Sequence, residues 1–524
     1  MRLHGRRTDP PGAPVHRVFE THAKAHPGRP ALTCGPVSYT YGELNERANR
    51  LAHWLLARGV GPGSVVGICL DRSPELVVTL LGALKAGAAY APLDPSYPAE
   101  RLRLMTEQLA HADLIAVSPA TSALVEHCAD KAVEVAGLDL DAFPATEPEV
   151  AVDGESLCYV VFTSGSTGAP KATAVRHKGW YNLLEWVTGE FGLGADSSNL
   201  MISSFGFDIS QRSLMAPLFS GATLHLLPSR SFDVLMASRL IRELKVRTLH
   251  CAPSALYLLI QRDEESGGEI LASLQYAFVG GEPLSVSRLE SWAKNNAGSG
   301  RIVNVYGVAE CTDVSSFHAL TDYADYAAHG VPIGRPVNNT DLYILDEDLR
   351  SVAPGQTGEI CVAGLGVGAG YLNAPALNEE RFVTAPLDGG RDVAVYRTGD
   401  MGYVRDDGEL MCVGRVDTQV KIRGMRIDLG EVENAVRSCQ GVRDAVVLVA
   451  GGEPNGGEAH LAAFVIPEPA TDGRAAELDS RALRSELLAA HPRHLVPKTF
   501  VAVPGFPLSP NGKVDRRALA HQAG

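Results

Sequence analysis

Apolar positions recur along the chain with two different periods, and this predicts short buried strands separated by amphipathic helices. Residues 43–58 place leucines and alanines on one helical face, and the apolar runs at 64–70 and 88–94 are typical of buried strands. Between these runs, Ser73 stands at a helix start and Gly87 at a helix end. The order strand, helix, strand is the repeating unit of a parallel sheet.

The same alternation continues as far as residue 306, with a further helix predicted at 177–190. Additional strands are predicted at 113–118, 158–162, 199–204, 222–228, 247–252, 274–279 and 301–306. This order predicts largely parallel sheets covered by helices, and ligands of such sheets bind at the carboxyl ends of the strands.

Beyond Ile333 the pattern changes to short β-rich segments joined by glycine-containing turns, and from Asp417 a smaller α+β pattern begins. In that last part, strands are predicted at 444–449, 460–466 and 500–503, with helices near 430–439 and 480–491. We therefore predict an α/β protein whose large N-terminal domain, residues 1–416, combines mostly parallel helix-covered sheets with a β-rich subdomain. A small, mobile α+β C-terminal domain, residues 417–524, is predicted to follow.

Charge and composition narrow the function classes. The net charge of −14 argues against a nucleic-acid-binding or anionic-membrane-binding surface, but a single cationic loop still suffices to bind a nucleotide. The basic N-terminus has no apolar core behind it and no stretch is long enough to span a bilayer, so a cytoplasmic location is expected. The nine cysteines are scattered without a CxxC pair, which predicts reduced thiols and no zinc site.

The segment TSGSTGAPK, 163–171, follows the apolar run at 158–162 and combines two glycines, four hydroxyl side chains and a lysine. These residues are Gly165, Gly168, Thr163, Ser164, Ser166, Thr167 and Lys171. Glycines bring backbone amides close to a ligand, and the hydroxyls and the lysine add donors and charge, so the segment is suited to a polyphosphate. An ordinary surface turn is the alternative. A Walker phosphate loop is excluded, because Pro170 precedes the lysine and Ala172 follows it.

The segment resembles the phosphate loop of the adenylate-forming enzymes, the superfamily of acyl-CoA synthetases, luciferases and adenylation domains of non-ribosomal peptide synthetases. Other strings resemble that family's motifs in the family's order and over nearly the whole chain. They are YTYGELNERANRLA from Tyr39, LKAGAAYAPLDPSYPAERL from Leu84, FDIS from Phe207, NVYGVAE from Asn304, GEICVAGLGVGAGYL from Gly358, YRTGD from Tyr396, GRVDTQVKIRGMRIDLGEVE from Gly414 and NGKVDRRAL from Asn511.

The resemblance implies that a carboxylate attacks the α-phosphorus of ATP to give an acyl-adenylate and pyrophosphate, after which a thiol takes the acyl group. It implies ATP and Mg²⁺, with Lys513 contacting the substrate carboxylate and the α-phosphate, and with Thr163 of the phosphate loop as a further catalytic residue; a solvated tail lysine is the alternative for Lys513. Tyr306 and Gly307 would hold the adenine, and Glu310 would bind Mg²⁺ and serve catalysis. The sequence departs from the family just before Glu310, where Val308-Ala309 replaces the usual Pro-Thr.

By the same resemblance Asp400 would accept hydrogen bonds from both ribose hydroxyls, assisted by Arg415, whereas an Asp that orders a glycine turn and pairs with Arg415 is the alternative. Asp417 lies where the family hinges between its two domains. Rotation there would exchange Lys513 for the KIRGMR segment at the active site, where Gly424 would leave room for a phosphopantetheine arm.

The resemblance also implies that Asp208 pairs with the α-ammonium group of an amino acid substrate, because amino-acid-activating members of the family have an Asp at this place; a helix N-cap is the alternative. The side-chain pocket implied by position consists of Ile209, Arg212, His250, Ala277, Val279, Gly280, Val305, Asp313 and Val314. Either Arg212 and Asp313 pair with each other around a small substrate, or one of them meets a polar or charged substrate side chain. His250 is alternatively a satisfied core histidine. A small or polar amino acid is expected.

The resulting hypothesis is a free-standing adenylation enzyme of the non-ribosomal peptide type that acts with a separate phosphopantetheinylated carrier protein. A small MbtH-like helper protein is a second candidate partner. An acyl-CoA synthetase is the rival enzyme, and Asp208 speaks against it. A degenerate nucleotide-binding protein is the non-enzymatic rival, suggested by Val308-Ala309 and by Ala172, where the family usually has glycine.

Overall fold

The fold is that of a computed structural model, which describes residues 1–524 except 11, 110–111, 165–169, 296–299, 417–418, 453–456, 469–477, 508–515 and 521–524. Local sequence signals set the helix ends. Helix α2 (Tyr41–Leu56) begins with a capping box in which Thr40 and Glu43 bond each other's backbone amides, and α3 (Pro74–Lys85) begins where the Ser73 hydroxyl accepts from the amide of Leu76. Helix α3 connects β4 (Val65–Cys69) and β5 (Ala89–Pro92), which pair in parallel as the alternation predicts, whereas α2 connects β3 (Val37–Thr40) with β4, and these two strands belong to different sheets.

The largest sheet of the described residues is nine-stranded, and its central strands run parallel. In spatial order its strands are β16 (Arg335–Pro336), β15 (Ser316–Ala319), β14 (Arg301–Tyr306), β13 (Tyr276–Gly280), β12 (Thr248–Cys251), β10 (Asn199–Met201), β11 (Leu224–Leu226), β2 (Pro30–Cys34) and β3 (Val37–Thr40). Among the described strands of this sheet, only the outer pairs β14–β15, β15–β16 and β2–β3 are antiparallel.

A second sheet, seven-stranded over the residues that the structure covers, has a parallel centre and an antiparallel edge. Its strands in order are β19 (Gly370–Tyr371), β9 (Lys171–Arg176), β8 (Leu157–Thr163), β5 (Ala89–Pro92), β4 (Val65–Cys69), β6 (Ala112–Val117) and β7 (Ala132–Glu134). Strands β8 and β9 form a hairpin in which Thr163 is paired with Lys171.

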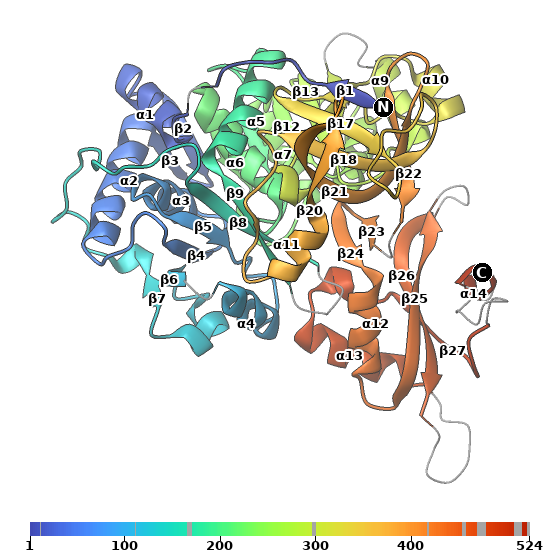
Figure 1. The fold of residues 1–524 in the computed structure, drawn as a ribbon. Coiled ribbons are helices and arrows are strands. Elements are labelled where there is room, and N and C mark those ends of the chain that lie inside the picture. The colour runs from blue at the N-terminus through green and yellow to red at the C-terminus, as the bar shows by residue number, and fades with distance from the viewer. Residues whose placement is uncertain are drawn as a thin grey trace.

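One apolar core joins the facing sides of the two sheets. Helices α1 (His16–Ala25), α5 (His177–Glu190) and α6 (Asp208–Ser220) contribute to it together with α2 and α3. A second core covers the other side of the nine-stranded sheet. The helices beyond these are α4 (Ala99–Gln108), α7 (Val234–Leu244), α8 (Pro253–Glu265), α9 (Val286–Asn295), α10 (Tyr323–His329) and α11 (Pro375–Arg381). Figure 1 shows α1 to α3 at one end of the molecule and the C-terminal part at the other.

An antiparallel sheet accounts for the β-rich pattern predicted beyond Ile333. It contains β17 (Thr340–Leu345), β18 (Gly358–Gly364), β20 (Phe382–Leu387), β21 (Arg391–Val404) and β22 (Leu410–Arg415). Its edge is β1 (Arg2–His4), which pairs with β17 and was not predicted. The side chains of Arg2 and His4 contact Asp341 at 3.2 and 3.0 Å, so charge pairing supplements the short strand.

The C-terminal part has its own sheets and cores. A hairpin of β23 (Gln419–Ile422) and β24 (Met425–Asp428) precedes a sheet of β25 (Val442–Gly452), β26 (Gly457–Pro467) and β27 (Thr499–Ala502), with α12 (Leu429–Arg437), α13 (Ser480–Ala490) and α14 (Arg516–Ala520). Its apolar side chains form separate clusters. The predicted fold class is thus confirmed. The domain boundary at 416 and 417 stays a prediction, because Asp417 lies outside the described residues.

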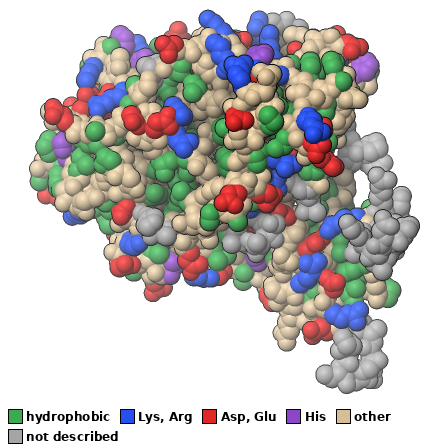
Figure 2. All heavy atoms as spheres, viewed as in Figure 1, with side chains coloured by type: hydrophobic (Ala, Val, Ile, Leu, Met, Phe, Trp, Pro, Cys, Tyr) green, Lys and Arg blue, Asp and Glu red, His purple; other side chains and the backbone are tan. Residues whose placement is uncertain are grey.

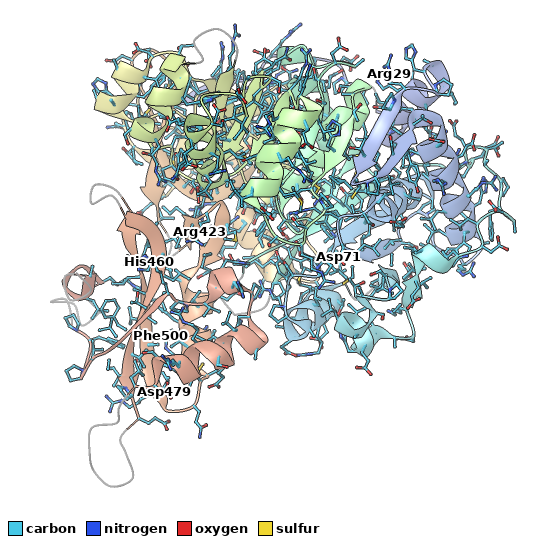
Figure 3. All side chains as sticks on the ribbon, turned by 180° about the vertical axis from the view of Figure 1, so that it is seen from behind. Arg29, Asp71, Arg423, His460, Asp479 and Phe500 are labelled. Carbon is cyan, nitrogen blue, oxygen red and sulfur yellow. The ribbon has the colours of Figure 1, made fainter. Side chains whose placement is uncertain are left out.

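Charged side chains of both signs are interspersed over the face drawn in Figure 2. Of the helices that the structure describes, none combines the length and the apolarity that crossing a bilayer requires. The view from behind in Figure 3 shows Arg423, at the turn of the β23–β24 hairpin, beside the large domain, while His460, Asp479 and Phe500 lie farther out in the small one.

Candidate active site

A cavity of about 610 Å³ lies where strands β8, β12, β13 and β14 end. The ends of β8 and β14 contribute Thr163, Ser164 and Val305 to its wall. The turn and second strand of the β23–β24 hairpin line it from the small domain. The cavity is therefore built between the two domains, at the carboxyl edge where parallel sheets bind their ligands.

The predicted phosphate loop is the turn of the β8–β9 hairpin. Gly165, Ser166, Thr167 and Gly168 lie outside the described residues, but both ends of the turn are described. Thr163 lines the cavity, and its hydroxyl is buried without a hydrogen-bond partner among the residues described. A buried hydroxyl of this kind fits a ligand with acceptor oxygens, such as a phosphate. At the other end, burial and the charge of Arg426 lower the pKa of Lys171.

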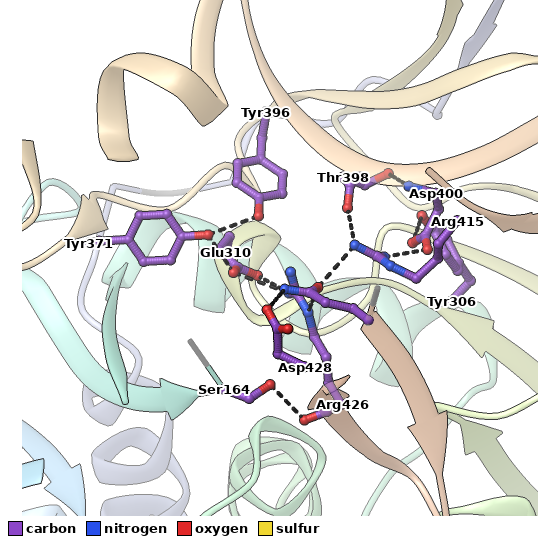
Figure 4. Close-up of polar contacts among 11 residues, drawn as sticks. Ser164, Tyr306, Glu310, Tyr371, Tyr396, Thr398, Asp400, Arg415, Arg426 and Asp428 are labelled. Atoms are coloured by element: carbon purple, nitrogen blue, oxygen red, sulfur yellow. Dashed lines mark hydrogen bonds and ion pairs between the residues drawn. The ribbon is translucent and has the colours of Figure 1, made fainter. Parts of the chain in front are cut away.

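Glu310 is fully buried in a short 3-10 turn (Ala309–Cys311) and is already paired. Arg426 of β24 donates from Nη1 to both carboxylate oxygens, at 3.0 and 3.1 Å, and the Tyr371 hydroxyl donates at 2.6 Å, as Figure 4 shows. Burial alone would raise the pKa of Glu310, but the Arg426 charge and the tyrosine outweigh it and lower the pKa. In this domain arrangement the carboxylate does not fit Mg²⁺, because a cation already neutralises it.

Tyr306, Asp400 and Arg415 meet at the other side of Glu310 (Figure 4). The Tyr306 hydroxyl donates to one oxygen of Asp400 at 2.7 Å, and Arg415 donates to the other. Lys421 of the hairpin stands over the Tyr306 ring, 5.4 Å from its centroid. Asp400 keeps lone pairs for the two ribose hydroxyls, so this arrangement accommodates both predicted roles, the diol acceptor and the partner of Arg415.

Asp208 is the first residue of α6 and lies in the cavity wall. It is not the helix cap, because Phe207 holds that position and the carboxylate accepts, within the described part of the chain, from the neighbouring amide of Ile209 alone, at 2.8 Å. Enclosure by protein and the charge of Asp313 raise the pKa of Asp208 to about 7. Among the described residues no cation forms an ion pair with it.

Arg212, one turn further along α6, is fully buried and joins the other two ionisable residues of the predicted pocket. Its Nε donates to Asp313 at 2.6 Å, and its Nη1 donates to His250 Nδ1 at 2.5 Å. The His250 ring stacks on Phe278, at 4.7 Å between centroids. The first alternative of the sequence analysis, a pair between Arg212 and Asp313, is the one that the structure contains.

The other predicted pocket residues divide between the two faces of the nine-stranded sheet. Ile209, Gly280 and Val305 line the cavity, and so does Gly307, which was predicted to hold the adenine. Because side chains alternate along a strand, Ala277 and Val279 point to the opposite face, where they join the second core. Val314 is buried in the first core and is not part of the cavity lining. Phe278, which the sequence analysis did not select, shares the face of His250.

The contacts between the domains were not predicted. Arg101 of α4 donates to Glu431 of α12 at 2.6 Å, and both side chains are buried. The Ser164 hydroxyl donates to the backbone oxygen of Arg426 at 2.9 Å. The KIRGMR string could have indicated Arg426, because it contains three cationic side chains. The sequence analysis assigned a role only to Gly424 of this string. Lys513 and Asp417 lie outside the described residues, so their roles stay predictions.

Comparison with known proteins extends these observations. Residues 19–372 match the family "AMP-binding enzyme", and residues 431–513 match "AMP-binding enzyme C-terminal domain". Tyrocidine synthase 3 of Brevibacillus parabrevis is 37% identical over 96% of this chain, and a dimodular nonribosomal peptide synthase of Bacillus subtilis (strain 168) is 38% identical over 97%. The chain spans only 8% and 22% of the lengths of these two relatives.

Solved structures agree with these matches. An artificially fused adenylation–PCP di-domain, NpsA-ThdA from Klebsiella oxytoca, is 26% identical with a TM-score of 0.81, each chain being covered to 93%. Holo-PA1221, a non-ribosomal peptide synthetase protein with adenylation and PCP domains, is 28% identical with a TM-score of 0.83, over 98% of this chain and 84% of its own. With the cavity between two domains and the family match over most of its length, the chain belongs to the AMP-binding enzymes.

Proposed function

We propose that this AMP-binding enzyme activates an amino acid with ATP and passes it to the thiol of a phosphopantetheinylated carrier protein. Asp208 is the observation that carries the proposal. A carboxylate in the wall of a cavity, raised in pKa and without a paired cation among the described residues, is suited to an ammonium group. A fatty or aryl acid offers no such group.

In the first step a carboxylate oxygen of the amino acid attacks the α-phosphorus of ATP, and the bond to the bridging oxygen breaks so that pyrophosphate leaves. Negative charge grows on the phosphoryl oxygens during this displacement and needs donors and cations aimed at them. Thr163 offers a hydroxyl that has no partner among the described residues, and Lys171 offers a cation, at the two ends of the phosphate turn. Asp400 would hold the ribose and Tyr306 the adenine, with Lys513 reaching the α-phosphate.

In the second step the thiol sulfur attacks the carbonyl carbon, a thioester forms and AMP leaves with the bonding electrons. The position of the β23–β24 hairpin supports this step. The hairpin turn lines the cavity, and a Cβ on Gly424 would lie 2.5 Å from the Ala252 methyl, so only a glycine fits this close approach. The resemblance to proteins that contain adenylation and PCP domains supports a carrier protein as the thiol donor.

Amino-acid-dependent exchange of pyrophosphate into ATP tests the proposal. Exchange with one amino acid, reduced at least a hundredfold in Asp208→Ala and in Lys513→Ala, is the expected result. Exchange that responds to an aryl or fatty acid and is insensitive to Asp208→Ala would instead identify an acyl-CoA synthetase. Nucleotide binding without exchange for any acid, with or without a co-produced MbtH-like protein, would identify a binding protein.

A further inference from the structure

Three buried ionisable side chains, Arg212, His250 and Asp313, meet beside the cavity. Arg212 bonds Asp313 through Nε and His250 through Nη1, at 2.6 and 2.5 Å. Arg212 and His250 have no exposed surface, and Asp313 is 8% exposed. Arg212 and Asp313 also line the cavity, so a substrate side chain that enters from Asp208 reaches this cluster.

Two donors of the cluster have no partner among the residues that the structure describes. Arginine nitrogens only donate, so His250 Nδ1 must be the acceptor and its proton resides on Nε2. That Nε2 and the Arg212 Nη2 are both buried and have no hydrogen-bond partner in the described part of the chain. An unpaired buried donor costs about 1–3 kcal/mol. The cluster therefore favours a ligand that brings an acceptor.

The charges of the cluster are already balanced. Arg212 and Asp313 neutralise each other, and burial together with the Arg212 charge lowers the pKa of His250 far below its ordinary value, so that its ring is neutral. A substrate carboxylate here would place a second anion beside Asp313, and a substrate ammonium would place a second cation beside Arg212. Either charge would be buried without a counter-ion.

The length of the side chain is limited by α6. Asp208 and Arg212 are four residues apart on this helix, so both face the same side and lie about 6 Å apart along the axis. An ammonium held by Asp208 therefore leaves room for a side chain of a few atoms before the guanidinium. A large aromatic ring does not fit this interval.

The position of Asp313 is enforced by an unusual backbone. Thr312 and Asp313 both adopt left-handed conformations, with φ of 60° and 67°, and the Thr312 hydroxyl donates to the Gly366 oxygen at 2.6 Å. A Cβ on Gly307 would lie 2.0 Å from the backbone oxygen of Asp313, so only glycine fits there. Strain of this kind persists where the surrounding structure holds a functional side chain in place.

On these grounds we propose that the enzyme selects an amino acid with a short, uncharged side chain that carries an acceptor oxygen, a hydroxyl or a carboxamide, and that Arg212 is the specificity-determining residue. This inference rests on the proposed amino acid activation. Arg212 Nη2 would donate to the side-chain oxygen, while Asp313 fixes the guanidinium from the other side.

The first test compares isosteres in the pyrophosphate exchange assay: serine against alanine, threonine against valine, and asparagine against leucine. A pocket built to bond an oxygen rejects the analogue that lacks it, so kcat/KM for the preferred amino acid should exceed that of its partner at least 10³-fold. Preference for valine, leucine, lysine, aspartate or phenylalanine would overturn the inference and leave amino acid activation standing. Exchange with aryl or fatty acids alone would overturn the proposed function, and the inference with it.

The second test replaces the ion pair as a unit, with Arg212→Leu and Asp313→Leu combined, so that no buried charge is left alone. The double variant should prefer the apolar isostere, while KM for ATP changes less than threefold. Arg230→Leu with Asp71→Leu is the matched control, because this Arg–Asp pair is partly exposed, with only Arg230 lining the cavity, and its loss should leave selectivity unchanged. An unchanged preference in a folded double variant would overturn the role of Arg212; if the variant does not fold, the isostere comparison decides alone.

Discussion

Arg426 of the small domain is the counter-ion of Glu310, a carboxylate that is fully buried in the large domain. The guanidinium of Arg426 and a divalent metal ion would compete for the Glu310 carboxylate, because the single negative charge of Glu310 is already balanced by Arg426. The docked hairpin therefore belongs to a state without metal at Glu310. Binding of a divalent cation there requires that β24 withdraw.

Arg426→Ala should consequently strengthen metal binding. Without its counter-ion Glu310 is a buried unpaired anion, and a divalent cation compensates it. We expect the Kd for Mn²⁺, measured by the loss of its free-ion electron paramagnetic resonance signal in the absence of nucleotide, to fall about tenfold or more.

Arg423→Ala is the control for this measurement, since Arg423 lies at the turn of the same hairpin and is exposed. Its Mn²⁺ affinity should equal that of the parent chain. Equal affinities in all three proteins would show that Arg426 does not compete with the metal.

The buried pair of Arg101 and Glu431 should stabilise the same domain arrangement. Glu431→Gln leaves Arg101 buried without a counter-ion, which costs about 3–5 kcal/mol where the pair is docked. Transfer of the aminoacyl group to a pantetheine thiol should fall at least tenfold, whereas pyrophosphate exchange should be little affected if the first step uses another arrangement. Combining Glu431→Leu with Arg101→Met should recover part of the transfer rate. An equal loss in both half-reactions would assign the pair to general stability instead.

The sequence predicted those parts of the fold that are encoded locally. Helix α5 was predicted at both of its ends, and strand β14 has its predicted bounds. Strand β1 was missed, because its partner β17 lies 339 residues away and no local pattern encodes such a pairing. Likewise Ala277 and Val279 were placed by position alone, and the alternation of side chains along β13 directs them away from the cavity.

The contacts between the domains could not be predicted from the sequence, for a different reason. Arg426 belongs to a recognised string, yet its partner Glu310 is 116 residues away and had been assigned to a metal. Which cation a buried carboxylate holds depends on the domain arrangement, and a motif does not specify the arrangement. The pairing of Arg212 with Asp313 was one of two open alternatives, and geometry decides between them.

Amino acid binding should depend on pH through Asp208. The ionised carboxylate is the form that pairs with an ammonium, and its pKa in the empty site is raised to about 7. At a pH below this pKa the carboxyl of Asp208 is protonated and must lose its proton before the amino acid binds. KM for the amino acid should therefore rise about tenfold for each pH unit below 7 and stay level above pH 7. Exchange assays at saturating ATP measure this. Asp208→Asn should give a high KM without the slope, and a level KM from pH 5.5 to 8 in the parent chain would contradict the assignment.

Nucleotide binding should depend on Asp400. Asp400→Ala removes the proposed acceptor for the ribose hydroxyls and the partner of Tyr306 and Arg415, so KM for ATP should rise about 10- to 100-fold, as expected for hydrogen bonds to a charged group. Tyr306→Phe removes only one hydrogen bond to Asp400 and should raise KM for ATP less than Asp400→Ala does. KM for the amino acid serves as the internal control and should be nearly constant in both variants.

The proposed ammonium anchor, Asp208, and the proposed side-chain selector, Arg212, both belong to helix α6. Its residues from Ser210 to Phe219 are buried, so neither Asp208 nor Arg212 can shift without disturbing the core. A rigid helix fixes the distance between the two side chains, so the site selects substrates by their length and does not adapt to them. Broader selectivity in this enzyme would therefore have to arise by substitution along α6 and its partners, one residue at a time, and not by loosening of a loop.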